Sequence, residues 1–165
     1  ICPSTGDIAL VEYCTIHANL AGHNTVAVWA DKVGESTYRA ERRGYEGAIR
    51  GKKVVVIMDR ISNGGTTMKI IKEAQRCGAI VIGVAALSAI TAADEEMFSV
   101  PKVHALSRLD VDNFPKDEIP DRYKGLPICI DEPLGHGGQF RRLDNGQWQS
   151  GYVLLLEEGG PQLFD

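Results

Sequence analysis

The chain has 165 residues and a formal net charge of −4, with 44% hydrophobic and 24% charged residues. This length is that of one ordinary domain, and the composition is that of a soluble globular protein, which we expect in the cytoplasm. The charge excludes a basic field for sequence-independent nucleic-acid binding, and no apolar run approaches the ~20 residues of a membrane span. The four scattered cysteines include no Cys-x-x-Cys pair, so neither a zinc site nor a disulfide framework is indicated.

Helix and strand patterns alternate from the start of the chain. It begins with a segment typical of a strand already under way, so we expect that an N-terminal segment is absent. Apolar residues at helical spacing predict a helix over residues 8–21, ended by Gly22 and Asn24. Apolar and β-branched residues predict a strand over 25–30, and the polar residues 31–51 indicate a long loop or ribbon.

The next elements are more apolar. Residues 53–58 form a continuous apolar run, typical of a strand buried on both faces of a parallel sheet. The elements expected after it are a helix over 66–76 ended by Gly78, a strand over 79–87, a short helix over 92–98 and a strand over 103–106. This alternation predicts a doubly wound α/β fold with a mainly parallel sheet of about four or five strands.

The composition changes after Asp110. Residues 110–138 contain four prolines and many carboxylates, which indicates an ordered connecting segment. Asp144-Asn145-Gly146 lies between apolar runs and predicts a β-hairpin. We therefore assign residues 1–138 to one α/β domain and residues 139–165 to a C-terminal hairpin extension packed on it.

The segment VVVIMDRISNGGTTMKII, residues 54–71, carries the strongest functional signal. In an open parallel sheet, ligands bind beyond the carboxyl ends of the strands. Small residues let backbone N–H groups converge on an anion, and a helix N-terminus adds its positive end. The loop predicted to bind phosphate consists of Ser62, Asn63, Gly64, Gly65, Thr66 and Thr67. From this loop alone, a tight turn whose glycines serve only backbone geometry is an equally good interpretation.

The same segment resembles the diphosphoribosyl-binding motif of the type I phosphoribosyltransferases: a hydrophobic strand, two acids, two apolar residues and a small-residue phosphate loop. Three more segments resemble the orotate branch of this family. They are CPSTGDIAL, similar to the pyrophosphate loop before a helix; residues 29–56, similar to a segment with a lysine and a mobile loop; and RLDVDNFPKDEIP with GLPI and GHGG. The resemblance covers residues 1–138 in the order of the family.

The resemblance implies an enzyme that transfers the 5-phosphoribosyl group of phosphoribosyl diphosphate to a pyrimidine base and releases pyrophosphate. Mg²⁺ would be held by the substrate's oxygens and by water, without direct protein ligands. The expected partners are phosphoribosyl diphosphate, a pyrimidine base or nucleoside monophosphate, and a second copy in a homodimer. Neither nucleic acid nor a membrane is an expected partner.

The family pattern also implies roles for individual residues. The loop 62–67 would bind the 5′-phosphate, and Asp59 would accept hydrogen bonds from the ribose hydroxyls. The pyrophosphate would be bound by Ser4, Thr5 and Gly6. Lys32 and Arg39 are the further catalytic residues that we expect, with Arg42 and Arg43 as alternatives to Arg39 for the charge that closes the mobile loop.

Three residues depart from the family pattern. Met58 stands where the first of two acids is usual, and losing a charged hydrogen bond costs on the order of 1.5–3 kcal/mol, so Met58→Asp is expected to raise ligand affinity in an eroded site. Arg60 adds a cation that pairs with Asp59 or reaches a phosphate. Asp7 replaces a usual glycine in the pyrophosphate loop, where it would repel an anion.

The N-terminal hood, which contacts the base in the family, has no counterpart in this sequence. Two alternatives to the enzyme therefore stay open. One is a non-catalytic phosphoribosyltransferase-like module that binds a nucleotide or phosphosugar for regulation. The other is a purely structural subunit of a larger assembly.

Overall fold

The computed structural model describes residues 1–4, 6–34, 37–41, 44–90, 92–110 and 120–121. The chain divides into two compact units, Ile1–Val111 and Asp112–Asp165, and every element described below belongs to the first. The predicted hairpin, most of the predicted connecting segment and the boundary at residue 138 lie outside the described residues and stay predictions.

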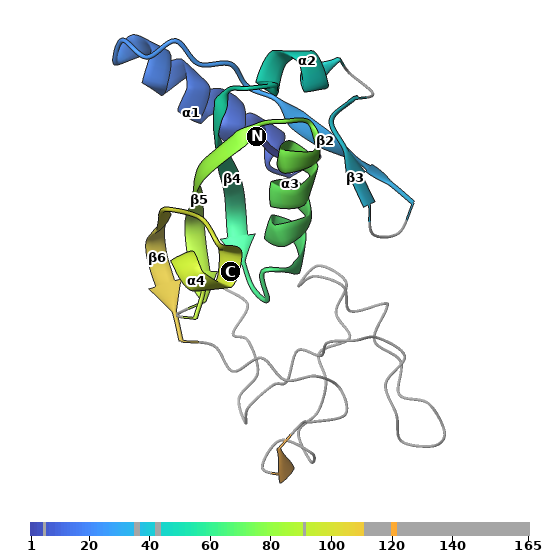
Figure 1. The fold of residues 1–165 in the computed structure, drawn as a ribbon. Helices are drawn as coiled ribbons and strands as arrows, with labels where there is room; N and C mark the ends of the chain where they lie inside the picture. The colour runs from blue at the N-terminus through green and yellow to red at the C-terminus, as the bar shows by residue number, and fades with distance from the viewer. Residues whose placement is uncertain (5, 35–36, 42–43, 91, 111–119, 122–165) are drawn as a thin grey trace, which may run out of the picture. The chain divides into compact units, whose positions relative to one another are not determined.

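The described strands form two three-stranded sheets, which hydrogen bonds of Ile1 join edge to edge. The strands are β1 (Cys2–Pro3), β2 (Trp29–Val33), β3 (Thr37–Arg39), β4 (Lys53–Ile61), β5 (Ile80–Ile90) and β6 (Val103–Leu109) (Figure 1). The pairs β1–β2, β4–β5 and β5–β6 are parallel. The pair β2–β3 is antiparallel. Ile1 donates its N–H to the Val55 carbonyl at 2.8 Å and accepts from the Ile57 N–H at 2.8 Å, so β1 lies beside β4. The strand order is therefore β3-β2-β1-β4-β5-β6.

This order reverses direction between β1 and β4. α1 (Ile8–Leu20) follows β1 and α3 (Gly65–Arg76) follows β4, and right-handed connections then place the two helices on opposite faces of the sheet. Figure 1 shows α3 beside β4 and α1 passing behind it. The predicted doubly wound, mainly parallel α/β fold is confirmed.

The core lies between α3 and the side of the sheet that faces it. Alternate β4 residues Val54, Val56 and Met58 are buried there, because successive side chains of a strand point to opposite faces. Ile70 and Ile71 of α3 are buried in the same cluster. The buried polar residues of α3 are Thr67 and Glu73, and the partners of Glu73 are given below.

Several element boundaries differ from those predicted. β2 begins at Trp29 rather than at residue 25, and Val26 is exposed. β4 continues past Met58 to Ile61, because β5 extends far enough to pair with the residues that follow. α2 (Tyr45–Ile49) lies inside the segment predicted as a loop or ribbon.

The C-terminal elements and the cysteines of the first unit show two further differences. α4 (Glu95–Phe98) is shorter than predicted, because Asp94 caps it and accepts the Met97 N–H at 2.8 Å. The helical patterns around Cys14 and Cys77 predict that both thiols are buried; Cys77 is buried, but Cys14 is exposed, since α1 buries only Val11 fully. None of the described helices is long and apolar enough to cross a membrane.

Candidate active site

The carboxyl ends of β1, β2 and β4 lie side by side, where the strand order reverses and ligands bind in folds of this type. Ser4 follows β1 and donates its N–H to the Ala30 carbonyl at 2.8 Å. Its Oγ accepts the N–H of Lys32 in β2 at 3.2 Å. Asp59 is near the end of β4, so the structure brings Ser4, Lys32 and Asp59 to one edge of the sheet. Thr5 lies outside the described residues.

Asp7 is buried at the start of α1, with 5% of its surface exposed. Its Oδ1 accepts the backbone N–H of Asp59 at 2.6 Å. Burial raises the pKa of Asp7 to about 6, with a contribution from the Asp59 carboxylate, although the bond from the Asp59 N–H acts in the opposite direction. The Asp7 carboxyl therefore binds the β4 backbone instead of standing free in the loop after β1.

The sequence suggested that Arg60 pairs with Asp59 or reaches a phosphate, and the structure bears on the first of these roles. Asp59 is exposed and lies inside β4 rather than in a loop after it. The Arg60 N–H donates to Asp59 Oδ1. Among the ion pairs of the described residues, none joins the Arg60 guanidinium to Asp59. The Asp59 residue is thus exposed, and its carboxylate has no ion pair among the described residues.

Met58 is a core residue, with 3% of its surface exposed. It shares the face of β4 that packs under α3, whereas Asp59 is exposed on the next position of the strand. A carboxylate in place of Met58 would enter the core rather than the site. The first acid of the family motif therefore has no functional equivalent at this position.

The predicted phosphate loop joins β4 to α3. Its exposed residues include Ser62, Asn63 and Thr66, whereas Thr67 is buried. The Asn63 Oδ1 accepts the Gly65 N–H at 3.0 Å. The helical hydrogen bonds begin with Met68 N–H to the Gly64 carbonyl at 2.9 Å, so the N–H groups of residues 66 and 67 precede them. Within the described residues these two N–H groups have no recorded acceptor, which makes them the donors available to an anion.

Gly64 is required by geometry whether or not an anion binds. It has φ 74°, and a Cβ there would lie 2.9 Å from Phe98 Cε1 of α4. We expect Gly64→Ala to lower the free energy of unfolding by about 1–3 kcal/mol, from left-handed strain and overpacking. Urea unfolding followed by circular dichroism measures the change. The control is Gly47→Ala in α2, where a Cβ meets no atom within 4 Å and unfolding stability should hold or rise; equal effects would contradict this account.

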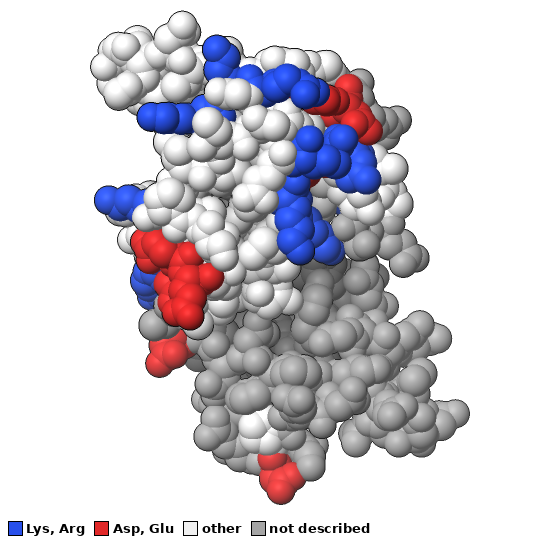
Figure 2. All heavy atoms as spheres, in the orientation of Figure 1, with Lys and Arg blue, Asp and Glu red and all other residues white. Residues whose placement is uncertain are grey.

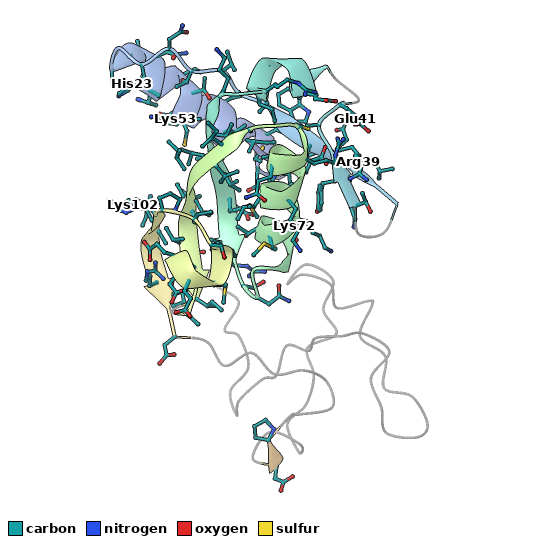
Figure 3. All side chains as sticks on the ribbon, in the orientation of Figure 1. His23, Arg39, Glu41, Lys53, Lys72 and Lys102 are labelled. Carbon is teal, nitrogen blue, oxygen red and sulfur yellow. The ribbon has the colours of Figure 1, made fainter. Side chains whose placement is uncertain are left out.

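Arg39 is bound at the other end of α3. Its Nη1 donates to Glu73 Oε2 at 3.3 Å, and Glu73 also accepts the Ala40 N–H at 2.8 Å and Arg76 Nε at 2.8 Å. Burial alone would raise the pKa of Glu73, but the bonds from Arg76 and Ala40 hold it below its usual value. Figure 3 shows Arg39 beside α3. Glu73 is about 12 Å along the helix from Gly65, so the structure does not bring Arg39 to the phosphate loop.

Basic side chains cover the exposed side of α3, as Figure 2 shows. Lys69, Lys72 and Arg76 are exposed there, and Arg39 adjoins them through Glu73. The catalytic role of Arg39 stays a prediction, and its alternatives Arg42 and Arg43 lie outside the described residues. In the part of the chain that is described, no three His, Cys, Asp or Glu residues gather as metal ligands. Mg²⁺ bound through substrate oxygens also stays a prediction.

Sequence reasoning found the edge of the sheet but missed the contact between Asp7 and Asp59. Asp7 was recognised as an unusual residue in the pyrophosphate loop, and that departure was the available signal. Its partner could not be inferred, because the two residues are separated by 52 positions.

Comparisons with known proteins give relatives of one kind. No family model matches the chain. It is 30% identical over 88 residues to an orotate phosphoribosyltransferase of Caldanaerobacter subterraneus, covering 53% of this chain and 44% of that protein. It is 28% identical over 104 residues to an orotate phosphoribosyltransferase of Chlorobium phaeobacteroides, covering 59% and 53%. The chain thus spans about half the length of the curated relatives it matches.

Solved structures of phosphoribosyltransferases are also similar. An adenine phosphoribosyltransferase from Rhodothermus marinus matches with a TM-score of 0.49 and 22% identity, over 65% of this chain and 66% of that one. A phosphoribosyltransferase from Corynebacterium diphtheriae matches with a TM-score of 0.39 and 16% identity, over 62% and 73%.

Proposed function

This chain is related to the type I phosphoribosyltransferases, and on that premise we propose that it transfers a 5-phosphoribosyl group from phosphoribosyl diphosphate to a pyrimidine base of the orotate type. The observation that carries the proposal is the gathering of Ser4, Lys32 and Asp59 at one carboxyl edge of the sheet, beside the N-terminus of α3. A phosphorylated sugar requires a carboxylate that binds its hydroxyls, a cation and free N–H donors that bind its phosphate.

In the proposed reaction, the bond between ribose C1 and the pyrophosphate oxygen breaks while a nitrogen of the base bonds to C1. Positive charge develops on the ring, so the protein's task is to orient the sugar and stabilise the departing anion. Asp59 would accept hydrogen bonds from the ribose hydroxyls, and the N–H groups of Thr66 and Thr67 would hold the 5′-phosphate. Lys32 and the residues after β1 would hold the pyrophosphate. When bound to oxygens of the pyrophosphate, Mg²⁺ would neutralise part of their negative charge.

The test is release of pyrophosphate by the full chain from phosphoribosyl diphosphate and Mg²⁺, with orotate, uracil and adenine as acceptors. We expect release with orotate and production of the matching nucleoside monophosphate. Release with adenine alone would move the proposal to another base. No release with any base, from a folded chain, would contradict transferase activity. The proposed homodimer and cytoplasmic location need separate measurements.

Asp59→Asn should lower kcat/KM by about 10–100-fold, because an amide loses the charge that strengthens the bonds to the ribose hydroxyls. The measurement is steady-state kinetics with the acceptor found above. The matched control is Glu46→Gln on α2, a carboxylate that pairs with Arg50 on the surface and should leave kcat/KM unchanged. Equal kinetics for Asp59→Asn and wild type would remove Asp59 from the site.

A second function, ligand binding without turnover, is favoured by the burial of Met58 and by the engagement of Arg39 with Glu73. In both cases a side chain that the family pattern would direct to the substrate is engaged elsewhere in the fold. This function predicts that phosphoribosyl diphosphate or a nucleoside monophosphate binds, as measured by calorimetry, while no base triggers pyrophosphate release.

A further inference from the structure

The contact between Asp7 and Asp59 replaces a missing strand-to-strand bond. The Ile57 N–H of β4 donates to the Ile1 carbonyl, and two residues later the Asp59 N–H points to the same side. β1 ends at Pro3, and the Asp7 carboxyl accepts the Asp59 N–H at 2.6 Å. A side chain that is nearly fully buried therefore fixes the backbone at Asp59.

The side chain of Asp59 also faces the loop that carries Asp7. A Cβ at Gly6 would lie 4.0 Å from Asp59 Oδ2, so the carboxylate stands just above this loop. Asp59 itself is exposed, whereas Asp7 is too buried to touch a substrate. Asp7 therefore has no direct contact with a ligand, and its hydrogen bond reaches the ligand site through Asp59.

We propose that Asp7 is a positioning residue that holds Asp59 in the orientation in which its carboxylate binds ribose hydroxyls, an inference that rests on the proposed function. Met58 cannot share this task, because its side chain lies in the core on the other face of β4. In this proposal a carboxyl from the loop after β1 orients Asp59, the proposed sugar-binding acid.

The protonation state of Asp7 sets how it holds Asp59. The titratable groups around it are Asp59 on β4 and the Cys2 thiol on β1, with Glu12 of α1 acting on the same thiol. When neutral, the Asp7 carboxyl can accept the Asp59 N–H and also share its proton with the Asp59 carboxylate. Ionised Asp7 still accepts the Asp59 N–H, but its charge repels the Asp59 carboxylate. Because the pKa of Asp7 is raised to about 6, this change falls between pH 5 and pH 7.

The first test uses the chain without ligand and does not depend on the proposed function. The Asp59 backbone amide resonance, followed by NMR from pH 4.5 to 8, should shift with an inflection near pH 6. In Asp7→Asn this inflection should vanish, since the amide has no proton to lose in this range. An Asp59 amide in wild type that shows no such inflection would overturn the inference.

The second test measures binding of phosphoribosyl diphosphate with Mg²⁺ by calorimetry at pH 5.5 and 7.5, as the ratio of each variant to wild type. Taking the ratio cancels the ligand's own ionisation. Asp7→Asn mimics the neutral carboxyl, so its affinity should equal that of wild type at pH 5.5 and exceed it about five-fold at pH 7.5. Asp7→Ala, which loses the acceptor, should bind about ten-fold more weakly at both pH values.

The matched control is Glu12→Gln, an exposed carboxylate on α1, for which the ratio should stay near one at both pH values. A purely structural role for Asp7 would leave the Asp7→Asn ratio independent of pH. That result, or wild-type affinity in folded Asp7→Ala, would contradict the inference alone. A wild-type chain that binds no phosphoribosyl diphosphate at either pH would contradict the proposed function as well. If Asp7→Ala fails to fold, the pH dependence of Asp7→Asn decides.

Discussion

Met58→Asp should destabilise the protein by about 3–5 kcal/mol, because the new carboxylate enters the core beneath α3 without a partner. Met58 is 3% exposed and belongs to the same buried cluster as Val56 and Ile70. A domain has about 5–15 kcal/mol of total stability, so this one substitution removes a large part of it. The measurement is urea unfolding followed by circular dichroism, at pH 7.

The control for Met58→Asp is Met58→Leu, which keeps the volume and the apolar character and should cost less than about 1.5 kcal/mol. From the sequence alone, Met58→Asp was expected to restore an acid of the site and to raise ligand affinity. The structure corrects this expectation, since position 58 faces away from the exposed side of Asp59. Unchanged stability together with tighter binding of phosphoribosyl diphosphate would show that residue 58 reaches the ligand.

Glu73→Ala should cost about 3 kcal/mol at pH 7, since it removes the buried acceptor that joins β3 to α3. Glu73 binds Arg39, Arg76 and the Ala40 N–H, and its side chain is 2% exposed. Breaking such a pair leaves charges without partners and typically costs 3–5 kcal/mol. The side chains of Arg39 and Arg76 are 38% and 40% exposed, so water can solvate their charges and the lower end of this range applies.

The pH dependence of this cost has a definite sign. The pKa of Glu73 is lowered in the folded state, so the carboxylate stabilises the fold at pH values above about 4.3, its ordinary value in an unfolded chain. This contribution is lost as the pH falls through the lower folded-state pKa. The difference in unfolding free energy between wild type and Glu73→Gln should therefore shrink below about pH 4.

Glu46→Gln is the matched control for the Glu73 variants. Its carboxylate forms a surface ion pair with Arg50, and such pairs contribute about 0–1 kcal/mol. Unfolding in urea at pH 3, 4, 5 and 7 measures all three variants. A Glu73 variant that behaves like Glu46→Gln at pH 7 would contradict a structural role for the network.

Local patterns in the sequence were enough to predict most of the scaffold. The helical spacing of apolar residues located α1 and α3, and the apolar runs located β4, β5 and β6. Gly22 and Gly78 have φ of 90° and 81° where the two long helices end, as the sequence predicted. These features depend on neighbours within a few positions, so the sequence carries them directly.

Some features of the site were decided only by tertiary structure. A strand that is apolar at nearly every position has no alternation, so the packing of α3 on β4 decided that Met58 faces the core. Arg39 lies in a polar segment, and only the approach of Glu73 shows which partner it takes.

The sequence by itself determined an α/β chain and located a glycine-rich turn and Asp59 at one edge of its sheet, while anion binding by that turn stays a prediction. Tertiary structure alone determined which side chains share that edge and which are turned inward. The reason is that hydrogen bonds and ion pairs between residues far apart, such as Asp7 with Asp59 and Arg39 with Glu73, form only after distant strands and helices pack. No local pattern encodes such a contact, because it depends on the position of both partners in the folded chain.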